Sequence, residues 1–122
     1  CIGENKSEKK KKKTLSVLKK QLVRVLKKNF NKNNIIIAYE PIWSIGTGKI
    51  PTVSELKKTT IHIKKVLKSI FRKNSPAVLY GGSVDGANVT MFKEIKEIDG
   101  FLIGGASKSS KKFIDIIKNY YR

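Results

Sequence analysis

Glu40 is the residue of this chain whose neighbours best suit it to act as an acid or a base. It follows an apolar run at residues 35–38, and Pro41 comes directly after it. Proline disfavours helical backbone in the residue before it, so Glu40 is predicted to stay extended at the end of a buried strand. A general base needs a fixed position of this kind, shielded in part from water. A structural acid or a surface carboxylate would show the same pattern, so both interpretations stay open.

The segment after Glu40, PIWSIGTGK at residues 41–49, has the composition of a mobile loop. Gly46 and Gly48 give the backbone freedom on either side of Thr47, and Trp43, the only tryptophan, adds a large apolar side chain. Loops of this kind close over sites and exclude water, which strengthens the electrostatic interactions beneath them. We therefore expect this segment to act as a lid above Glu40.

Two later strands are predicted to end in glycine pairs. YGGSV at residues 80–84 and FLIGGAS at residues 101–107 each place two glycines where a strand turns toward the next helix. Without side chains, the backbone N–H groups of such turns can converge on an anion, aided by the positive end of a helix dipole. One glycine pair is equally typical of an ordinary tight turn. Two pairs on consecutive strands favour a phosphate-binding site.

Apolar periodicity predicts strands that alternate with helices. Amphipathic spacing predicts a helix over residues 14–29, and Thr52 with Glu55 predicts a capping box that opens a second helix ending near Phe71. Buried strands are predicted at residues 35–38, 77–84 and 100–107, and the opening CIG is predicted to be the tail of another strand. Asp85 could cap a shorter helix, and apolar residues within 113–117 form the stripe of a last helix. This alternation predicts parallel strands in an α/β layered or barrel fold, as one domain over residues 1–122. Ligands bind at the carboxyl ends of parallel strands, so Glu40 and the glycine turns are expected to line one cavity.

Composition limits the class of protein. The chain has 122 residues, a net charge of +18, one cysteine and one histidine. The single cysteine excludes an internal disulfide and suits a reducing compartment, and no structural metal site is expected. No apolar run approaches the roughly 18 residues that a membrane span needs, and the N-terminus does not resemble a signal peptide. The charge suggests nucleic acid as a partner, but aromatic platforms and reader motifs are missing, which favours a solvated lysine surface.

The longest motif, AYEPIWSIGTGK at residues 38–49, resembles the catalytic-glutamate strand and mobile loop of the triosephosphate isomerase family. YGGSV and DGFLIGGASK resemble the two phosphate-gripping segments of that family in the right order, and CIGE resembles its fifth strand end. The resemblance runs from Cys1 to the C-terminus. It implies an α/β fold that is the second half of a (β/α)8 TIM barrel, from the end of strand 5 through strands 6–8 with their helices. It also implies triose-phosphate isomerase activity, in glycolysis and gluconeogenesis, without cofactor or metal.

The resemblance assigns a role to each matching residue. It makes Glu40 the base that moves a proton between two carbons of dihydroxyacetone phosphate and glyceraldehyde 3-phosphate. The backbone amides of Gly46, Ser83, Gly104 and Gly105 match those that hold the phosphate dianion. The residues that match the lid and its latch are Pro41, Trp43, Ser44, Thr47, Gly48, Lys49 and Tyr80. The family often has alanine in place of Ser44, a difference that the lid should tolerate.

Other residues match the surroundings of the site. Glu4 matches a carboxylate near the catalytic face, and Cys1 matches a cysteine packed close behind the base. The family's asparagine, lysine and electrophilic histidine from earlier strands have no counterpart, because His62 is expected mid-helix as a surface or packing residue. We therefore expect this chain to be part of a working isomerase and to be inactive alone.

Two other interpretations remain, a half-barrel subunit without catalytic activity and a basic protein that binds nucleic acid or another polyanion. The isomerase interpretation predicts a triose phosphate as the small-molecule partner, and neither nucleic acid nor a membrane. It also predicts a homodimer for the full-length protein, in the cytoplasm or in an organelle such as a plastid.

Overall fold

Three parallel strands form the centre of the fold in the computed structural model, which describes residues 1–26, 30–72 and 75–122. Strands β1 (Ile36–Tyr39), β2 (Ala77–Tyr80) and β3 (Gly100–Phe101) lie in the order β1-β2-β3. Tyr39 is in register with Tyr80, and Tyr80 with Phe101. Ile2 forms a further parallel bridge to Tyr39, as predicted for the opening CIG. The predicted parallel pairing is therefore confirmed, and the strands end at the same edge.

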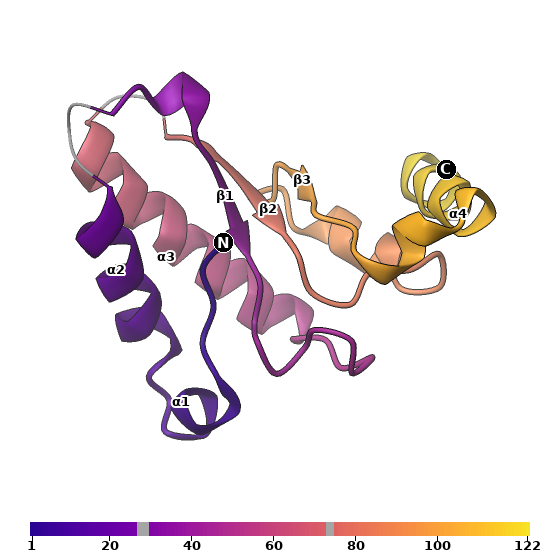
Figure 1. The fold of residues 1–122 in the computed structure, drawn as a ribbon, viewed down its shortest axis with the longest axis horizontal. Coiled ribbons are helices and arrows are strands. Elements are labelled where there is room, and N and C mark those ends of the chain that lie inside the picture. The colour runs from indigo at the N-terminus through magenta and orange to yellow at the C-terminus, as the bar shows by residue number, and fades with distance from the viewer. Residues whose placement is uncertain (27–29, 73–74) are drawn as a thin grey trace.

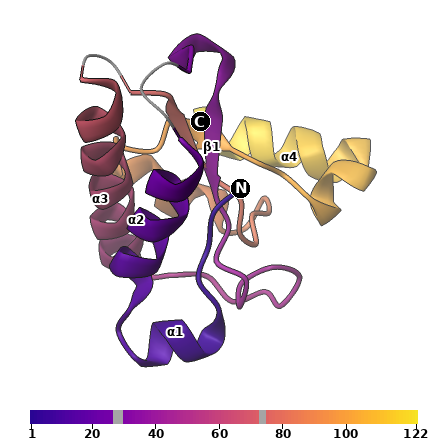
Figure 2. The same ribbon diagram turned by 60° about the vertical axis from the view of Figure 1, so that its left-hand side comes forward.

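Helices α2 (Thr14–Val25) and α3 (Val53–Phe71) lie side by side along β1 and β2 (Figure 1). Helix α4 (Ser110–Tyr121) follows β3 and extends away from them, as a turned view shows (Figure 2). His62 of α3 lies 2.9 Å from the backbone oxygen of Leu15 in α2, so its predicted packing role is confirmed. Within the described parts of the chain, no helix combines the length and the apolar character that crossing a bilayer requires.

The core lies between these helices and one face of the sheet. Leu18 and Leu22 of α2 and Leu56 and Ile63 of α3 are almost completely buried, as their spacing predicts. A row of aromatic rings continues this core across the sheet toward α4, with neighbouring centroids 5.2–6.3 Å apart in the order Tyr39, Tyr80, Phe92, Phe101 and Tyr120. The rings are tilted or edge-on, which is the favourable arrangement for aromatic pairs. The core therefore supports all three strand ends from the helix side.

The predicted capping box at the start of α3 is confirmed. The Thr52 hydroxyl accepts a hydrogen bond from the Glu55 amide at 3.2 Å, and the Glu55 carboxylate accepts one from the Thr52 amide at 2.9 Å. The Thr52 amide is the main reason that the pKa of Glu55 lies below its usual value, and Lys9, 3.6 Å away, lowers this pKa further. The box fixes the point where the loop after β1 ends and α3 begins.

Replacing Thr52 by alanine is expected to lower the free energy of unfolding by about 1 kcal/mol, because the Glu55 amide loses its side-chain acceptor. Urea denaturation followed by circular dichroism measures this change. Thr90→Ala is the matched control, since Thr90 is exposed in the short 3-10 helix Val89–Glu94. Equal losses in the two variants would contradict a specific role for the cap.

Two helices differ from the prediction near the N-terminus. Helix α1 (Lys6–Lys10) was not expected in the lysine run, yet Asn5 and Glu8 form a complete capping box at its start. Helix α2 ends at Val25, where the next residue, Leu26, has extended backbone, so α2 is shorter than the predicted helix, whose expected end at residue 29 lies outside the described residues. The cap compensates in α1 for the repulsion of neighbouring lysines.

Two predictions in the C-terminal third also need correction. Asp85 accepts hydrogen bonds from the amides of Ala87 and Asn88, as an N-cap residue does, but these bonds close a turn and the helix begins only after Asn88. The 3-10 helix Val89–Glu94 then follows in place of an α-helix. In α4 only Ile116 of the predicted apolar stripe is buried, while the others remain largely exposed, at 39% for Phe113, 46% for Ile114 and 44% for Ile117.

The face of the sheet opposite α2 and α3 is open at its start. Residue 36 was predicted to be buried on a strand covered on both sides, but Ile36 is 64% exposed. Its register partner Ala77 is exposed as well. The prediction is wrong here because both long helices pack on the other face, and nothing in the described chain covers this one. Only toward their carboxyl ends are the strands covered on both faces, where Ala38 and Tyr39 are buried.

Candidate active site

Glu40 leaves the sheet at the carboxyl end of β1 and is held there from both sides. Its backbone N–H donates to the Ile2 oxygen at 2.8 Å, and Pro41 after it is buried. Its side chain lies across the end of β2 against Gly81, where an added Cβ would overlap the Glu40 side chain. Gly81 is thus required by close packing, and the side chain of Glu40 is half-buried at a fixed point.

Glu40 and both glycine turns line one cavity of about 750 Å³. Ser83 belongs to the turn after β2, and Gly104 and Gly105 belong to the turn after β3. Gly46 and Gly48 of the loop after β1 also line it. The volume lies within the range typical of small-molecule sites. The Glu40 carboxylate at one wall and the glycine-rich turns beside it suit an anionic ligand with a proton to be moved, although Asp85 and Asp115 also line the cavity.

The loop over this cavity is fixed at its base and exposed at its tip. Ser44 is completely buried, whereas residues 45–49 are exposed. Gly46 and Gly48 have φ angles of 66° and 71°, a left-handed conformation that glycine adopts without strain. The Thr47 hydroxyl donates to the Trp43 oxygen at 3.0 Å and keeps the tip folded on itself. The exposed tip at the mouth of the cavity is what a lid requires.

A buried carboxylate supports the base of the loop. Glu4 is 1% exposed and accepts hydrogen bonds from the Tyr39 hydroxyl at 3.1 Å and from Trp43 Nε1 at 2.8 Å. On the other side, Lys9 Nζ lies 3.5 Å from the centroid of the Trp43 ring, a cation–π contact. Burial, followed by the neighbouring charge of Glu4, raises the pKa of Tyr39 well above its usual value. Because its pKa is raised, Tyr39 keeps its proton, and so remains a hydrogen-bond donor to Glu4, to a higher pH than an exposed tyrosine does.

Alkaline pH is expected to destabilise the chain through Tyr39. Its pKa is higher in the folded state than the value of about 10 in an unfolded chain, so the unfolded state loses its proton first. The stabilisation is complete below about pH 10 and is lost as the pH rises, by about 1.4 kcal/mol per pH unit for one tyrosine. Urea unfolding between pH 9 and 11 measures this slope.

Tyr39→Phe should flatten that slope, and Tyr121→Phe, at a residue that is 81% exposed, should leave it unchanged. An identical slope in wild type and in Tyr39→Phe would contradict the interpretation. Burial also raises the pKa of Tyr80, while its contact with Ser44 lowers it. A smaller slope should therefore persist in Tyr39→Phe.

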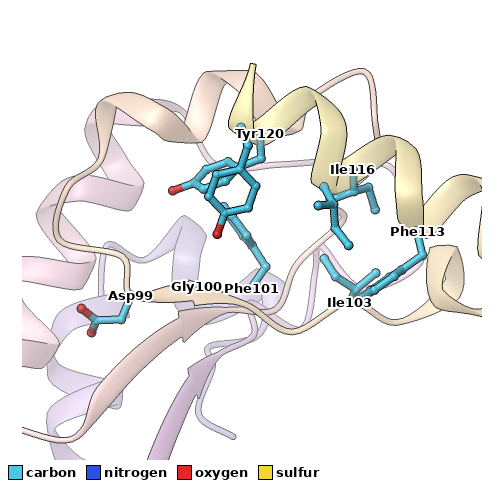
Figure 3. Close-up of a pocket in the computed structure, with 9 residues that line it drawn as sticks. Asp99, Gly100, Phe101, Ile103, Phe113, Ile116 and Tyr120 are labelled. Carbon is cyan, nitrogen blue, oxygen red and sulfur yellow. The ribbon is translucent and has the colours of Figure 1, made fainter.

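A second cavity, of about 450 Å³, lies between β3 and α4 and has a different character. Figure 3 shows Ile103 close to Phe113 and Ile116 of α4, with Phe101 and Tyr120 beside them. The carboxylate at its edge, Asp99, is engaged elsewhere, since it accepts hydrogen bonds from Lys64 Nζ at 2.9 Å and from the Val78 amide at 2.8 Å. The lining is otherwise apolar and tyrosine-rich, so the cavity beside Glu40 remains the candidate acid–base site.

Comparison with known proteins agrees with this geometry. The family model described as triosephosphate isomerase matches residues 1–120. The chain belongs to the triosephosphate isomerase family. The triosephosphate isomerase of Saccharomyces cerevisiae is 42% identical over 122 residues, which cover 98% of this chain and 49% of that protein. The triosephosphate isomerase of Rhizobium meliloti is 39% identical over 98% of this chain and 48% of its own length.

A solved structure extends the similarity to the fold. The crystal structure of triosephosphate isomerase from Bartonella henselae matches with a TM-score of 0.87 and 34% identity, over 100% of this chain and 49% of that chain. The parallel strands and their helices thus correspond to half of a TIM barrel, and the predicted fold class is confirmed. The chain spans about half the length of the curated relatives it matches.

The structure brings the predicted residues of the triosephosphate isomerase site into two groups. Glu40, Gly46, Ser83, Gly104 and Gly105 line the cavity, together with Gly48 of the lid. The remaining lid and latch residues do not line it: Pro41, Trp43, Ser44, Thr47 and Lys49 belong to the loop, and Tyr80 is the last residue of β2. Their roles in binding and catalysis stay predictions.

Sequence reasoning missed some residues at the site and misplaced one. Lys112 and Asp115 of α4 also line the cavity, and only their separation of 7 and 10 residues from Gly105 of the second glycine pair could have indicated this position. Cys1 was predicted to be packed behind the base, but it is exposed. It lines, with Glu40, a smaller cavity of about 240 Å³. Its exposure follows from its place at the start of the strand segment, which nothing in the described chain covers.

Proposed function

We propose that this chain carries the base and the phosphate-binding turns of a triose-phosphate isomerase that interconverts dihydroxyacetone phosphate and D-glyceraldehyde 3-phosphate. The observation that supports it most strongly is the single cavity shared by Glu40 and both glycine turns. The names of the relatives in the same family agree with this activity. The matched residues 1–120 would then form half of a single barrel domain.

The geometry suggests how the reaction would proceed. The phosphate dianion would accept hydrogen bonds from the amides of Ser83, Gly104 and Gly105, which leaves the three-carbon chain extending toward Glu40. Glu40 would take a proton from the carbon beside the carbonyl and return it to the neighbouring carbon through an enediolate. The loop at residues 41–49 would close over the intermediate and exclude water. Partial charge at the enediolate oxygens would need further donors.

Those donors are expected from outside this chain. His62, the sole histidine, contacts the Leu15 oxygen between α2 and α3 and does not line the cavity. Loss of one positioned charge stabiliser typically costs about 10²–10³ in rate, and loss of more than one costs more. The 122-residue chain alone is therefore proposed to have negligible isomerase activity.

The decisive assay compares two proteins. One is the purified chain alone, and the other is the chain joined to the part of the Saccharomyces cerevisiae relative that it does not match. We expect no measurable isomerase turnover from the chain alone and clear turnover from the joined protein, which we call the hybrid. Substantial turnover by the chain alone would contradict the need for outside donors. A folded hybrid without turnover would contradict the proposed function itself.

The setting of the reaction forms part of the proposal. The full-length protein would be a homodimer in the cytoplasm, or in an organelle such as a plastid, with a triose phosphate as its small-molecule partner. The lysine-rich surface would be solvated and would not bind nucleic acid. Binding of duplex DNA that falls steeply with salt and survives Glu40→Gln would favour the polyanion interpretation instead.

A further inference from the structure

Ser44 lies completely buried at the base of the loop at residues 41–49, and its environment is polar. Its exposed fraction is 0%, whereas the next residue, Ile45, is 52% exposed. The Ser44 hydroxyl donates to the backbone oxygen of Lys49 at the far end of the loop. It also lies 3.4 Å from the Tyr80 hydroxyl at the end of β2. One small side chain therefore joins both ends of the loop to the neighbouring strand.

The same residue contacts the glycine turn after β2. The backbone N–H of Ser83 donates to the Ser44 hydroxyl at 3.4 Å, and the Ser83 hydroxyl donates to the Ser44 backbone oxygen at 2.8 Å. Between them, Gly82 packs so closely that an added Cβ would lie 2.8 Å from Ser44 Oγ. The loop and the turn are thus joined by two hydrogen bonds and by direct packing around Ser44.

We propose that the Ser44 hydroxyl is a positioning group that fastens the loop to the turn at residues 81–83 and occupies the Ser83 amide while no ligand is bound. This inference rests on the proposed function, because that function assigns the Ser83 amide to the phosphate. The bond from the Ser83 amide is long at 3.4 Å and therefore weak. A phosphate dianion forms stronger, charge-assisted hydrogen bonds with the same donor, so it displaces the hydroxyl.

Displacement couples ligand binding to loop movement. When the Ser83 amide turns to the phosphate, the loop loses one of its two hydrogen bonds to the turn. Its exposed tip, with left-handed glycines at positions 46 and 48, is then less restrained and can move over the cavity. By linkage, a change that loosens the loop also makes the amide more available to phosphate. Ser44 thereby sets both the resting position of the loop and the affinity of the turn.

Hydrogen exchange in the ligand-free chain tests the fastening directly. The amides of Thr47 and Lys49 are the reporters, because each donates a hydrogen bond within the loop, at 3.3 Å in both cases. Ser44→Ala should speed their exchange by about tenfold, since loss of a buried hydrogen bond favours local opening by that order. Ser54→Ala, at an exposed serine in the first turn of α3, should leave exchange at both amides unchanged.

Unchanged exchange at both amides in folded Ser44→Ala would overturn the inference. If far-ultraviolet circular dichroism shows that this variant does not fold, Ser83→Ala serves instead, because it removes the other hydrogen bond between loop and turn. It should then speed the exchange of the same two amides. Failure to do so would overturn the inference equally.

A titration with glycerol 3-phosphate tests whether the Ser44 hydroxyl competes with phosphate for the Ser83 amide. Ser44→Ala should bind this ligand about threefold more tightly than wild type, because the competing hydroxyl is a weak partner. Equal dissociation constants would show that the hydroxyl does not compete, and the inference would be overturned. If neither protein binds the ligand but the loop of Ser44→Ala exchanges faster, the fastening stands and the proposed function fails.

Discussion

Replacing Glu40 by glutamine is expected to lower the isomerase turnover of the hybrid by about 10²–10⁴-fold, the usual contribution of a positioned general base. Glutamine has nearly the same shape as glutamate but cannot accept the proton from the substrate carbon. The position against Gly81 and the backbone bond to Ile2 do not depend on the charge of the side chain. The loss should therefore appear in kcat and leave the fold intact.

The measurement is steady-state kinetics of the hybrid with dihydroxyacetone phosphate, together with circular dichroism of each variant. Glu94→Gln is the matched control, because Glu94 is exposed at the end of the 3-10 helix Val89–Glu94 and does not line the cavity. It should retain wild-type turnover. Retention of more than about a tenth of the activity by Glu40→Gln would show that another group is the base.

The second large effect is expected at Gly3, whose lack of a side chain lets the N-terminal segment pack closely against the end of β1. Replacing it by alanine is expected to lower the free energy of unfolding by about 3 kcal/mol, the upper part of the range for overpacking. An added Cβ would overlap the Glu40 backbone oxygen and lie 2.7 Å from the Glu40 carbonyl carbon. Backbone cannot move aside as a flexible side chain can, so the parallel bridge between Ile2 and Tyr39 would have to open.

Gly105→Ala is the matched control for stability, since no atom lies within 4 Å of the position of its added Cβ. Urea denaturation of both variants should show a large loss for Gly3→Ala and a small change for Gly105→Ala. The side chain of Gln21 depends on the same backbone position, because it donates to the Gly3 oxygen at 2.9 Å and accepts from the Gly3 amide at 3.0 Å. If Gly3→Ala were as stable as wild type, the close approach in the structure would be wrong.

Local signals in the sequence predicted the elements best. The capping box of Thr52 and Glu55 and the stripe of α3 depend on residues three or four positions apart, and both are present as predicted. The box of Asn5 and Glu8 was equally local, but the surrounding lysines obscured it. Ile36 was misjudged because an apolar run indicates what a strand can bury, and not whether a partner covers it.

The site was predictable to the extent that parallel strands bring their carboxyl ends together. Glu40, Ser83 and Gly104 follow different strands, and they line one cavity for that reason. The contacts of Ser44 could not be predicted, because its bonds to Ser83 join residues 39 positions apart and depend on the packing of two loops. Sequence alone indicated that a serine in this place would be tolerated, whereas the structure gives its hydroxyl several partners.

The central claim is that one ligand spans the glycine turns and Glu40. Isotope-labelled chain titrated with glycerol 3-phosphate, with glycerol as the uncharged control, tests it most directly by nuclear magnetic resonance. The account predicts saturable shifts of the amides of Ser83, Gly104 and Gly105 and of the Glu40 carboxyl carbon, with no response to glycerol. Shifts confined to the lysines of α1, or absent from Glu40 and both turns at saturation, would contradict it.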